Sequence, residues 1–391
     1  MNILNKNIRL VILQRLIPHY RKGFFEKING IFPEARMIYG QATKTDSLKN
    51  AVDLDKNIFI KVKNLYFGNS GKIFISGMYS FLIRYKPEVI ISVFNVGNLN
   101  IYILFLLKFI LKYKIILWSF GYDPDRGFDP KNRLADKLRL KLSEKADAVI
   151  FYWEKGRAEI SKHTKKTDHF FMAPNTIDTD KLLKIKSELD KTGVENLKKE
   201  LGIKEKYHFI FISRLVKEKE ADVLIKAFSQ LEKKRQDCRL SIIGAGPESE
   251  SLRSLSESLN VRNIYFMGEI INDEETGKWI YVSDAFVLPG RLGNSVVQAF
   301  CFGTPVISQN KEYTHCEGIG YINEGLNGFL VVDGNINEIS ERMEQIISDP
   351  ELSEKLRINA FSTAVNDCSI EKMTEGYTEA INFVTIKKNG K

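Results

Sequence analysis

The sequence is poor in cysteine, and this scarcity indicates the kind of cellular compartment in which the protein works. Its four cysteines (Cys238, Cys301, Cys316 and Cys368) are far apart, and no Cys-x-x-Cys pair occurs. From the residues given we also expect no secretory leader. A disulfide framework is therefore not expected, and the pattern favours a reducing, cytoplasmic compartment.

Long apolar runs are also missing. The longest apolar segment extends from Leu99 to Trp118, and Lys108, Lys112 and Lys114 interrupt it. A membrane span needs about 20 mostly apolar residues, so a helix followed by a buried strand explains this segment better. No internal repeat or low-complexity tract is visible, and 391 residues suffice for two ordinary domains.

Acidic residues are scarce in the first half of the chain. Residues 1–190 hold 33 Lys and Arg against 19 Asp and Glu, whereas the rest holds 25 against 30. This asymmetry indicates either a solvated basic surface or a surface that faces anionic material. Nucleic acid, an anionic bilayer and a diphosphate-linked lipid all qualify, but no nucleic-acid recognition motif is present, so we expect no nucleic-acid partner.

Strand-like and helix-like runs alternate along the chain. Such alternation predicts an α/β fold with parallel sheets that are covered on both faces. Ligands of such sheets bind beyond the carboxyl ends of the strands, so the loops that follow strands are the places to search for a site. In the first half the predicted elements are strands at 8–17, 88–94, 114–119 and 146–152, and helices at 98–111, 131–144 and 154–163.

One stretch, residues 287–308, has the pattern of strand, glycine-bearing loop, helix, turn and strand. Pro289 and Gly290 end the first apolar run, and Asn294 or Ser295 can cap the helix. Gly303 supplies its C-terminal stop. A glycine-bearing loop that feeds a helix N-terminus suits a phosphate or diphosphate, although an ordinary βαβ unit has the same pattern.

This stretch resembles the donor-binding segment of retaining glycosyltransferases with the GT-B fold, the glycosyl transferases group 1 (family 4). Their pattern is P-S-x-x-E-x-F-G-x-x-x-x-E-A-x-x-x-G-x-P-V-I, and its two glutamates fall on Gly290 and Gln298. In the family the first glutamate contacts donor-sugar hydroxyls and the second contacts the ribose. Gln298 can keep the ribose contact, whereas Gly290 has no side chain to hold a sugar. The positions that fit the pattern are Gly293, Ala299, Gly303, Pro305, Val306 and Ile307.

A second stretch resembles the same family. The predicted strand 207–213 is followed by R-L-V-K-E-K-E-A-D-V-L-I-K-A-F, which is similar to the family's G-R-L-v-k-e-K-G segment. Arg214 ends the strand and Lys219 lies at the helix start, so both cations can meet a nucleotide diphosphate. Fixed cations stabilise the negative charge that builds on a leaving diphosphate. Arg214 and Lys219 are therefore the predicted catalytic residues.

The resemblance also implies the rest of the donor site. Backbone N–H groups at Asn294, Ser295 and Val296 would assist with the diphosphate, and the sugar would meet Gly293. Two further glycines lie on the family's path after predicted strands, and a G-x-G alone is weak evidence for a nucleotide. These are Gly244 and Gly268.

Four residues of the first half are candidates for the acceptor side. His19 lies in P-H-Y-R, which is similar to the opening of one branch of the family, although a lone histidine is more often structural. Phe120 and Gly121 stand where many relatives carry His-Gly near the donor sugar. Asp123 is either an acceptor-facing carboxylate or part of a plain Asp-Pro turn, and the lone D-x-D that it begins is discounted as a metal motif.

By resemblance we expect a GT-B architecture, two Rossmann-like domains facing across a cleft, and retaining transfer of a sugar from a UDP-sugar. The acceptor would be a glycan or a polyprenyl-diphosphate-linked glycan in surface polysaccharide assembly, at the inner face of the cell membrane. The sugar nucleotide is the co-substrate, and no other cofactor, metal or protein nucleophile is implied. A GT-B pseudo-enzyme or partner subunit and a UDP-sugar epimerase-like enzyme are the alternatives. The predicted segments are 1–185 (acceptor domain), 186–206 (linker), 207–368 (nucleotide-sugar domain) and 369–391 (a helix returning to the first domain).

Overall fold

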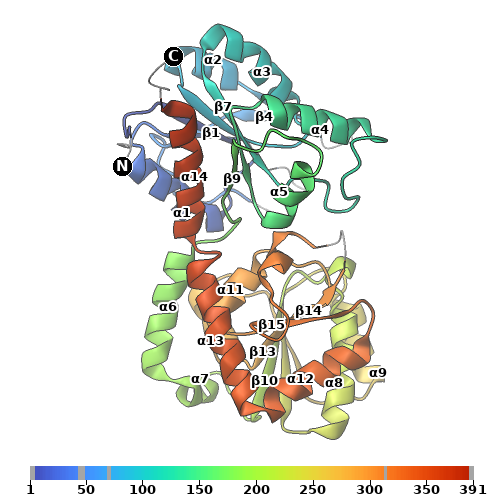
Figure 1. Ribbon diagram of the computed structural model, residues 1–391. Coiled ribbons are helices and arrows are strands. Elements are labelled where there is room, and N and C mark those ends of the chain that lie inside the picture. Colours follow the sequence, from blue (N-terminus) through green and yellow to red (C-terminus); the bar gives the residue numbers. More distant parts are fainter. Residues whose placement is uncertain (1–4, 43–48, 68–71, 312–314, 387–391) are drawn as a thin grey trace. The chain divides into compact units, whose positions relative to one another are not determined.

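The computed structural model describes residues 5–42, 49–67, 72–311 and 315–386. The chain forms two compact units (Figure 1). Unit 1 comprises residues 1–178 together with 370–391, and unit 2 comprises residues 179–369. Each contains one parallel sheet covered by helices, as the alternating pattern predicts.

Unit 1 is built on a seven-stranded sheet in the order β3-β2-β1-β6-β7-β8-β9, in which all pairs are parallel. The strand order reverses between β1 and β6, which lie side by side. A reversal of this kind leaves a crevice at the carboxyl ends of the two strands, where ligands bind in open α/β sheets. The strands are β1 (Leu10–Gln14), β2 (Arg36–Tyr39), β3 (Phe59–Lys61), β6 (Val89–Val93), β7 (Lys114–Ser119), β8 (Ala148–Phe151) and β9 (Phe170–Met172).

Successive residues of β1 enter opposite cores. Leu10 and Ile12 pack in the cluster that includes α1 (His19–Ile31) and α14 (Ile370–Thr385), whereas Val11 and Leu13 pack on the other face. That other cluster includes residues of α2, α3, α4 and α5, which are Met78–Tyr85, Leu99–Leu111, Leu134–Lys145 and Glu154–Ser161. A strand buried on both faces reads as one continuous apolar run, which explains why β1 shows no alternation in the sequence.

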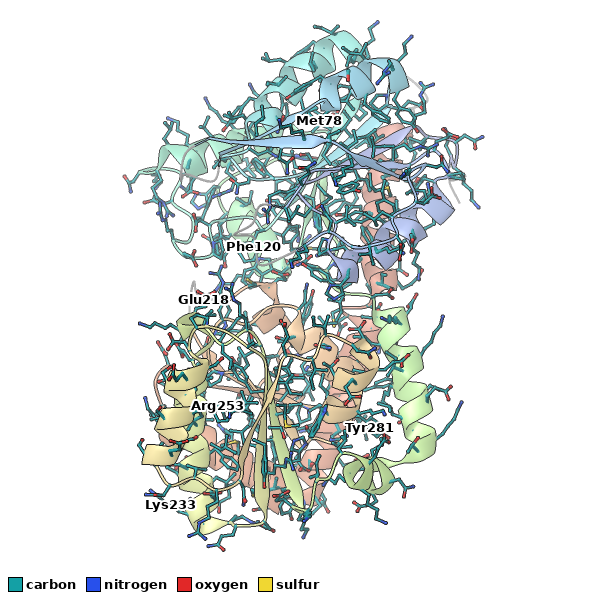
Figure 2. The ribbon with its side chains drawn as sticks, turned by 180° about the vertical axis from the view of Figure 1, so that it is seen from behind. Met78, Phe120, Glu218, Lys233, Arg253 and Tyr281 are labelled. Atoms are coloured by element: carbon teal, nitrogen blue, oxygen red, sulfur yellow. The ribbon has the colours of Figure 1, made fainter. Side chains whose placement is uncertain are left out.

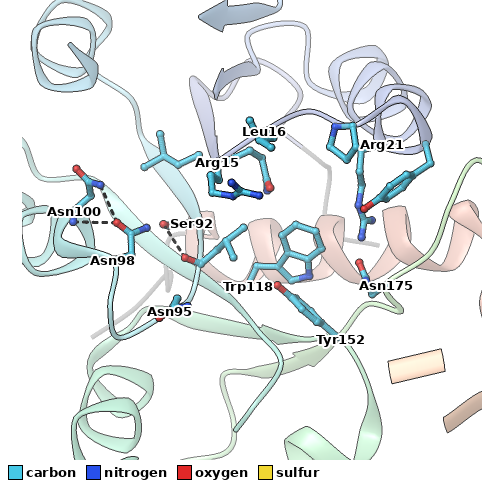
Figure 3. Close-up of a pocket in the computed structure, with 15 residues that line it drawn as sticks. Arg15, Leu16, Arg21, Ser92, Asn95, Asn98, Asn100, Trp118, Tyr152 and Asn175 are labelled. Atoms are coloured by element: carbon cyan, nitrogen blue, oxygen red, sulfur yellow. Dashed lines mark hydrogen bonds between the residues drawn. The ribbon is translucent and has the colours of Figure 1, made fainter. Parts of the chain in front are cut away.

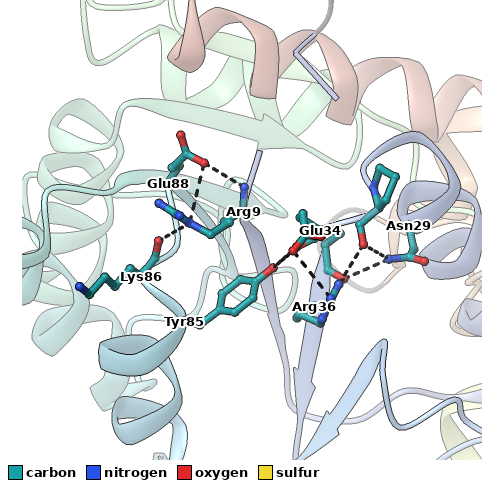
Figure 4. A network of polar contacts seen from close by, with 9 residues as sticks. Arg9, Asn29, Glu34, Arg36, Tyr85, Lys86 and Glu88 are labelled. Carbon is teal, nitrogen blue, oxygen red and sulfur yellow. Dashed lines mark hydrogen bonds and ion pairs between the residues drawn. The ribbon is translucent and has the colours of Figure 1, made fainter. Parts of the chain in front are cut away.

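The amino edge of the same sheet is closed by polar contacts (Figure 4). The backbone N–H of Arg9 donates to Glu88 Oε2 at 3.1 Å, and its side-chain Nε donates to Lys86 O at 2.9 Å. The Tyr85 hydroxyl donates to Glu34 O, and Arg36 Nη1 donates to Pro33 O at 2.9 Å. These contacts tie the starts of β1, β2 and β6 together, at the edge opposite the carboxyl ends of the strands.

Unit 2 contains a six-stranded parallel sheet in the order β12-β11-β10-β13-β14-β15, with the order reversing between β10 and β13. In Figure 2, Glu218 marks the carboxyl edge of this sheet and Lys233, near the end of α8, marks the opposite edge. The strands are β10 (Tyr207–Ile212), β11 (Cys238–Ile243), β12 (Ile264–Gly268), β13 (Ala285–Val287), β14 (Val306–Asn310) and β15 (Gly328–Val332). The helices are α8 (Ala221–Lys234), α9 (Ser249–Ser258), α10 (Asp273–Tyr281), α11 (Ser295–Cys301), α12 (Ile336–Ser348) and α13 (Pro350–Asn366), with 3₁₀ turns η1 (Lys217–Lys219) and η2 (Glu317–Tyr321).

The structure corrects the predicted linker at residues 186–206. Most of this segment is helical, in α6 (Thr179–Thr192) and α7 (Val194–Glu200), and it belongs to unit 2. Leu182, Leu189 and Leu197 are buried, and α6 packs against α10 and α11. The many Lys and Glu residues are the exposed face of an amphipathic helix, and their abundance hides the few leucines that anchor it.

The first-to-second-unit boundary therefore lies at residue 178, seven residues before the predicted one, and the return to unit 1 begins at Ile370. Helix α14 packs on β7, β8 and β9 of unit 1; the last five predicted residues of that segment, 387–391, lie outside the described part.

A two-stranded antiparallel sheet, β4 (Lys63–Phe67) with β5 (Lys72–Ser76), completes unit 1. Among the described residues, no helix is long and apolar enough to cross a bilayer.

Candidate functional site

Two loops meet at the carboxyl edge of the unit 2 sheet, where its strand order reverses. One follows β10 and carries Arg214 and Lys219; the other follows β13 and carries Gly290. The N–H of Gly290 donates to Lys219 O at 3.2 Å, and the N–H of Arg291 donates to Glu218 O at 2.7 Å. The two predicted motif segments, about 70 residues apart in the sequence, are therefore joined directly by backbone hydrogen bonds.

Gly290 makes this junction possible. It is buried, and a Cβ built on it would lie 2.3 Å from Glu218 O, 2.5 Å from Lys219 C and 2.6 Å from Lys219 Cα. These are backbone atoms that cannot rotate out of the way, so no larger side chain fits without moving the loop. The position where the family pattern has its first glutamate is thus occupied here by a close backbone contact, in which Gly290 N–H donates to Lys219 O.

Lys219 ends the 3₁₀ turn η1, and its ammonium Nζ donates to Arg291 O in the facing loop. Burial lowers the pKa of the Lys219 ammonium below its ordinary 10.5, while the nearby Cys316 and Glu218 oppose the shift. Partial burial strengthens the electrostatic interaction of this ammonium with any anion that reaches it.

Arg214 differs from Lys219 in its surroundings. Its side chain is exposed, and it makes no hydrogen bond or ion pair with any residue in the described part of the chain. Its backbone oxygen accepts from Val216 N at 3.0 Å, which shapes the loop before η1. The guanidinium is therefore available to a ligand at the carboxyl edge.

Glycines bring a third strand end against the same loop. Gly244, at φ +149°, would place a Cβ 1.9 Å from Ser213 O, and its N–H donates to Gly268 O at 2.7 Å. Gly246 would place a Cβ 2.2 Å from Leu215 O. Gly268 has φ +75° with open space around it. Gly244 and Gly246 therefore serve close packing of the loops after β10 and β11, and Gly268 serves a turn.

Helix α11 starts at the predicted position but is only seven residues long. Asn294 is its N-cap and makes no side-chain cap bond; its Oδ1 is buried and has no hydrogen-bond partner in the described structure. Ser295 begins the helix, while Val296 is buried and its N–H donates to Gly293 O at 3.3 Å. Gln298 Nε2 lies 3.4 Å from Thr276 Oγ1 of α10. Gly293 has nothing within 4 Å of an added Cβ, so its loop edge is open.

His315 is a positioning residue that the sequence analysis did not single out. Its Nδ1 accepts from Leu292 N at 3.0 Å and its Nε2 donates to Gln309 O at 2.6 Å, which defines a neutral ring protonated on Nε2. Burial lowers its pKa to about 4. The ring therefore stays neutral and pins the loop after β13 to β14. No local sequence signal marks this role, because the partner is a backbone N–H 23 residues away.

The four unit 1 candidates occupy different surroundings. His19 is exposed at the start of α1 and packs edge-on against the Tyr20 ring at 5.6 Å. Phe120 contacts a cluster of aromatic rings, and Trp153 Nε1 donates to its carbonyl at 3.0 Å. Gly121, at φ +101°, would place a Cβ 2.5 Å from Gly156 O, so it allows α5 to approach. Asp123 accepts from Asp125 N at 3.1 Å in a tight turn, the simpler of the two predicted roles.

A separate pocket lies at the strand reversal of unit 1 (Figure 3). Its volume is about 360 Å³, at the lower end of the range of small-molecule pockets, which is roughly 300–1,000 Å³. The ends of β1, β6 and β7 and the start of α1 form its walls. His19 is not among the lining residues, although Tyr20 and Arg21 beside it are. Within the described chain, no cluster of three His, Cys, Asp or Glu could hold a metal ion.

Comparison with known families and proteins agrees with this geometry. Residues 193–363, which include both loops of unit 2, match the family model of glycosyl transferases group 1. The chain is 27% identical over 221 residues to a poly(glycerol-phosphate) alpha-glucosyltransferase of Bacillus subtilis (strain 168), covering 56% of this chain and 30% of that protein. It is 23% identical over 247 residues to a GDP-mannose-dependent alpha-(1-6)-phosphatidylinositol monomannoside mannosyltransferase of Mycolicibacterium smegmatis, covering 61% and 62%. The aligned regions thus span less than two thirds of either relative.

Among solved structures, the chain is similar to Anabaena Alr3699/HepE in complex with UDP and glucose. The TM-score is 0.67 at 15% identity, covering 96% of this chain and 100% of that one. At this identity the likeness establishes the fold. The predicted α/β class with two Rossmann-like domains of GT-B architecture is therefore confirmed.

Proposed function

We propose that this protein is a retaining glycosyltransferase that moves a sugar from a nucleotide-diphosphate donor, a UDP-sugar, to a glycan or lipid-linked glycan acceptor. The observation that carries the proposal is the junction in unit 2, where Arg214 and Lys219 lie in a loop bonded to the one that feeds α11. The match of residues 193–363 to glycosyl transferases group 1 supports it. Both loops leave the sheet where ligands bind in folds of this kind.

In this proposal the unit 2 residues divide the donor between them. Arg214 and Lys219 bind the diphosphate, since one guanidinium is available and one ammonium is partly desolvated. Gln298 binds the ribose through its side-chain amide, whose Nε2 has only a long contact of 3.4 Å, to Thr276 Oγ1, to give up on binding. Asn294 Oδ1 accepts a hydrogen bond from a hydroxyl of the donor sugar, because this buried oxygen has no partner in the described structure. Asn294 thus takes over the sugar contact that Gly290 cannot make.

The transfer step follows from these contacts. The bond between the anomeric carbon and the diphosphate oxygen breaks, and its electron pair stays on the leaving diphosphate. The acceptor hydroxyl attacks from the same face and passes its proton to that departing phosphate, so the products are the glycoside and the nucleoside diphosphate. Two cations fixed beforehand at the leaving group stabilise the charge as it develops. No side-chain nucleophile takes part.

A nucleotide panel tests the donor assignment. UDP should raise the melting temperature in a concentration-dependent way, because a ligand that binds only the folded state stabilises it. UMP should act more weakly than UDP, since it lacks the phosphate that the second cation binds. GDP and ADP run in parallel show which base is preferred. If no nucleoside diphosphate shifts the melting temperature at millimolar concentration, the assignment fails.

We also propose that unit 1 contacts an anionic bilayer, which would give access to a lipid-linked acceptor. Helix α3 exposes three large apolar side chains, Leu106 at 68%, Phe109 at 82% and Ile110 at 74%. The exposed Lys112 follows them in the sequence, and the first half of the chain carries the net positive charge. Apolar side chains beside cations suit the boundary between acyl chains and anionic headgroups.

A further inference from the structure

The pocket of unit 1 is built from donors and cations, and its lining contains no acidic residue. Two arginines, Arg15 and Arg21, line it together with polar side chains from β1, β6 and β7. No Asp or Glu is among its fifteen lining residues. It lies at the carboxyl ends of β1 and β6, where the strand order reverses. A lining of this composition suits an anion better than a cation.

Arg21 indicates most strongly that the pocket suits an anionic ligand. Arg21 is only 6% exposed, yet its guanidinium forms no ion pair with any carboxylate in the described part of the chain. Instead Nη1 lies 3.2 Å from Met373 Sδ, and Cζ lies 5.0 Å from the Trp118 ring centre and 5.6 Å from that of Tyr20. A buried charge without a counter-ion is costly, and it is retained where an anion completes it.

Two further residues of the lining carry a buried donor that has no hydrogen-bond partner among the described residues. Trp118 is 3% exposed and Gln14 is 9% exposed, and neither Trp118 Nε1 nor Gln14 Nε2 has a hydrogen-bond partner in the described structure. An indole N–H can only donate. Unpaired buried donors beside an unpaired buried cation suit a ligand with negatively charged acceptor oxygens. Figure 3 shows Trp118 and Arg21 among the side chains that surround the pocket.

We propose that this pocket binds a phosphate or diphosphate group of the acceptor. Three residues on different elements, Arg21, Trp118 and Gln14, line one space and each carries a side-chain donor, and Arg15 adds a second cation. A phosphoryl group presents three or more oxygens to such an arrangement, whereas a carboxylate presents two. That the ligand is an acceptor rests on the proposed function; that the pocket binds a phosphoryl group does not.

The experiment follows the indole N–H of Trp118 by ¹H–¹⁵N NMR in the full-length protein. The chain has three tryptophans, so Trp118→Phe identifies the resonance. The probes are inorganic pyrophosphate, a hexose 1-phosphate and geranyl diphosphate, a short soluble prenyl diphosphate. Glucuronate and free glucose test for a carboxylate and for a neutral sugar. We expect saturable movement of the Trp118 resonance with the phosphate probes and none with glucose.

Matched variants show whether Arg21 is responsible. Arg21→Met should weaken the phosphate response at least tenfold, and Arg21→Lys, which keeps the charge but loses the fork, should fall between. Lys22→Met removes the same charge from the neighbouring, more exposed position, where Lys22 pairs with Glu26 at 3.8 Å, and should stay within twofold of the wild type. Circular dichroism of each variant verifies that it is folded.

A Lys219→Ala variant distinguishes binding in this pocket from binding at the donor site of unit 2. In this variant pyrophosphate should still move the Trp118 resonance. If the wild-type protein binds no nucleotide but phosphate probes still move the Trp118 resonance, the proposed function is rejected and the proposal of a phosphate-binding pocket remains supported. Tightest binding of geranyl diphosphate identifies a lipid-linked phosphate, and tightest binding of the hexose 1-phosphate identifies a phosphorylated saccharide; both support the proposal. It is overturned if no phosphate probe moves the resonance, if Arg21→Met responds like the wild type, or if glucuronate binds as well as phosphate.

Discussion

Replacing Gly290 should damage the protein even when the replacement is the glutamate of the family pattern. A Cβ at Gly290 would lie 2.3–2.6 Å from backbone atoms of Glu218 and Lys219, so the loop after β10 must move. Overpacking of this kind costs about 1–3 kcal/mol, and we expect about 2 kcal/mol for Gly290→Ala. In a unit of this size that lowers the melting temperature by about 4–8 °C. Because Lys219 moves with its loop, UDP affinity should fall at least tenfold.

Gly293→Ala is the matched control, since it lies in the same loop and has nothing within 4 Å of an added Cβ. It should change unfolding by less than about 0.5 kcal/mol, the usual range for substitutions away from packed features. Differential scanning calorimetry measures stability and isothermal titration with UDP measures affinity. If Gly290→Glu raises sugar-nucleotide affinity or turnover at unchanged stability, the position is a sugar-binding site that lost its side chain, and the packing argument is wrong.

Three other predictions concern the cations, the buried histidine and the apolar face of α3. Arg214→Ala and Lys219→Ala should each lower kcat/KM about 100-fold or more, which corresponds to about 2.7 kcal/mol of transition-state stabilisation. Lys217→Ala, in the same turn as Lys219, should change kcat/KM little. If Arg214→Ala or Lys219→Ala keeps near-wild-type turnover, that residue does not bind the leaving group. Because the pKa of His315 is lowered from 6.5 to about 4, the unfolded chain binds one more proton between these values, so stability falls as pH drops from 6.5 towards 4, by at most about 3 kcal/mol. In His315→Gln, the free energy of unfolding, measured by chemical denaturation at pH 7 and pH 4, should not show this part of the decrease. If the wild type and His315→Gln lose the same stability between these pH values, the ring does not titrate as proposed. The protein should sediment with anionic vesicles and be released by high salt, and Phe109→Ser should bind more weakly; equal binding to neutral and anionic vesicles would contradict the role of the charge.

The sequence predicted the elements of unit 2 well because strong local signals mark them. The stretch 207–213 is an apolar run flanked by charged residues, the helix after Lys219 is amphipathic, and the strand–loop–helix of 287–308 is bounded by proline and glycine; the structure has β10, α8 and β13 to β14 there. Parallel pairing then requires their carboxyl ends to share one edge. Which loops share that edge follows from topology, and so the joining of Arg214 and Lys219 to the loop after β13 could be anticipated.

What the sequence could not supply are the contacts that depend on distant backbone. Gly290 reads as a lost ligand in an alignment, and only the structure shows that residues 218–219 fill the space beside it. His19 attracts attention because histidine is chemically versatile, whereas Arg21, two residues on, is the one that turns into the pocket. The helical phase of α1 decides between them, and its phase depends on packing against α14. The predicted linker failed for a related reason: the few apolar positions of α6 acquire meaning only beside α10 and α11.

The central claim, sugar transfer from a nucleotide diphosphate, is tested most directly by incubating the protein with radiolabelled UDP-sugars and membranes from its source cell. We predict protein-dependent incorporation of label into lipid or glycan, release of UDP in equal amount, and loss of both in Lys219→Ala. The same incubation separates the enzyme from a pseudo-enzyme, which would bind UDP and UDP-sugars alike. Binding of UDP without incorporation from any nucleotide sugar, in wild-type protein, would contradict the claim.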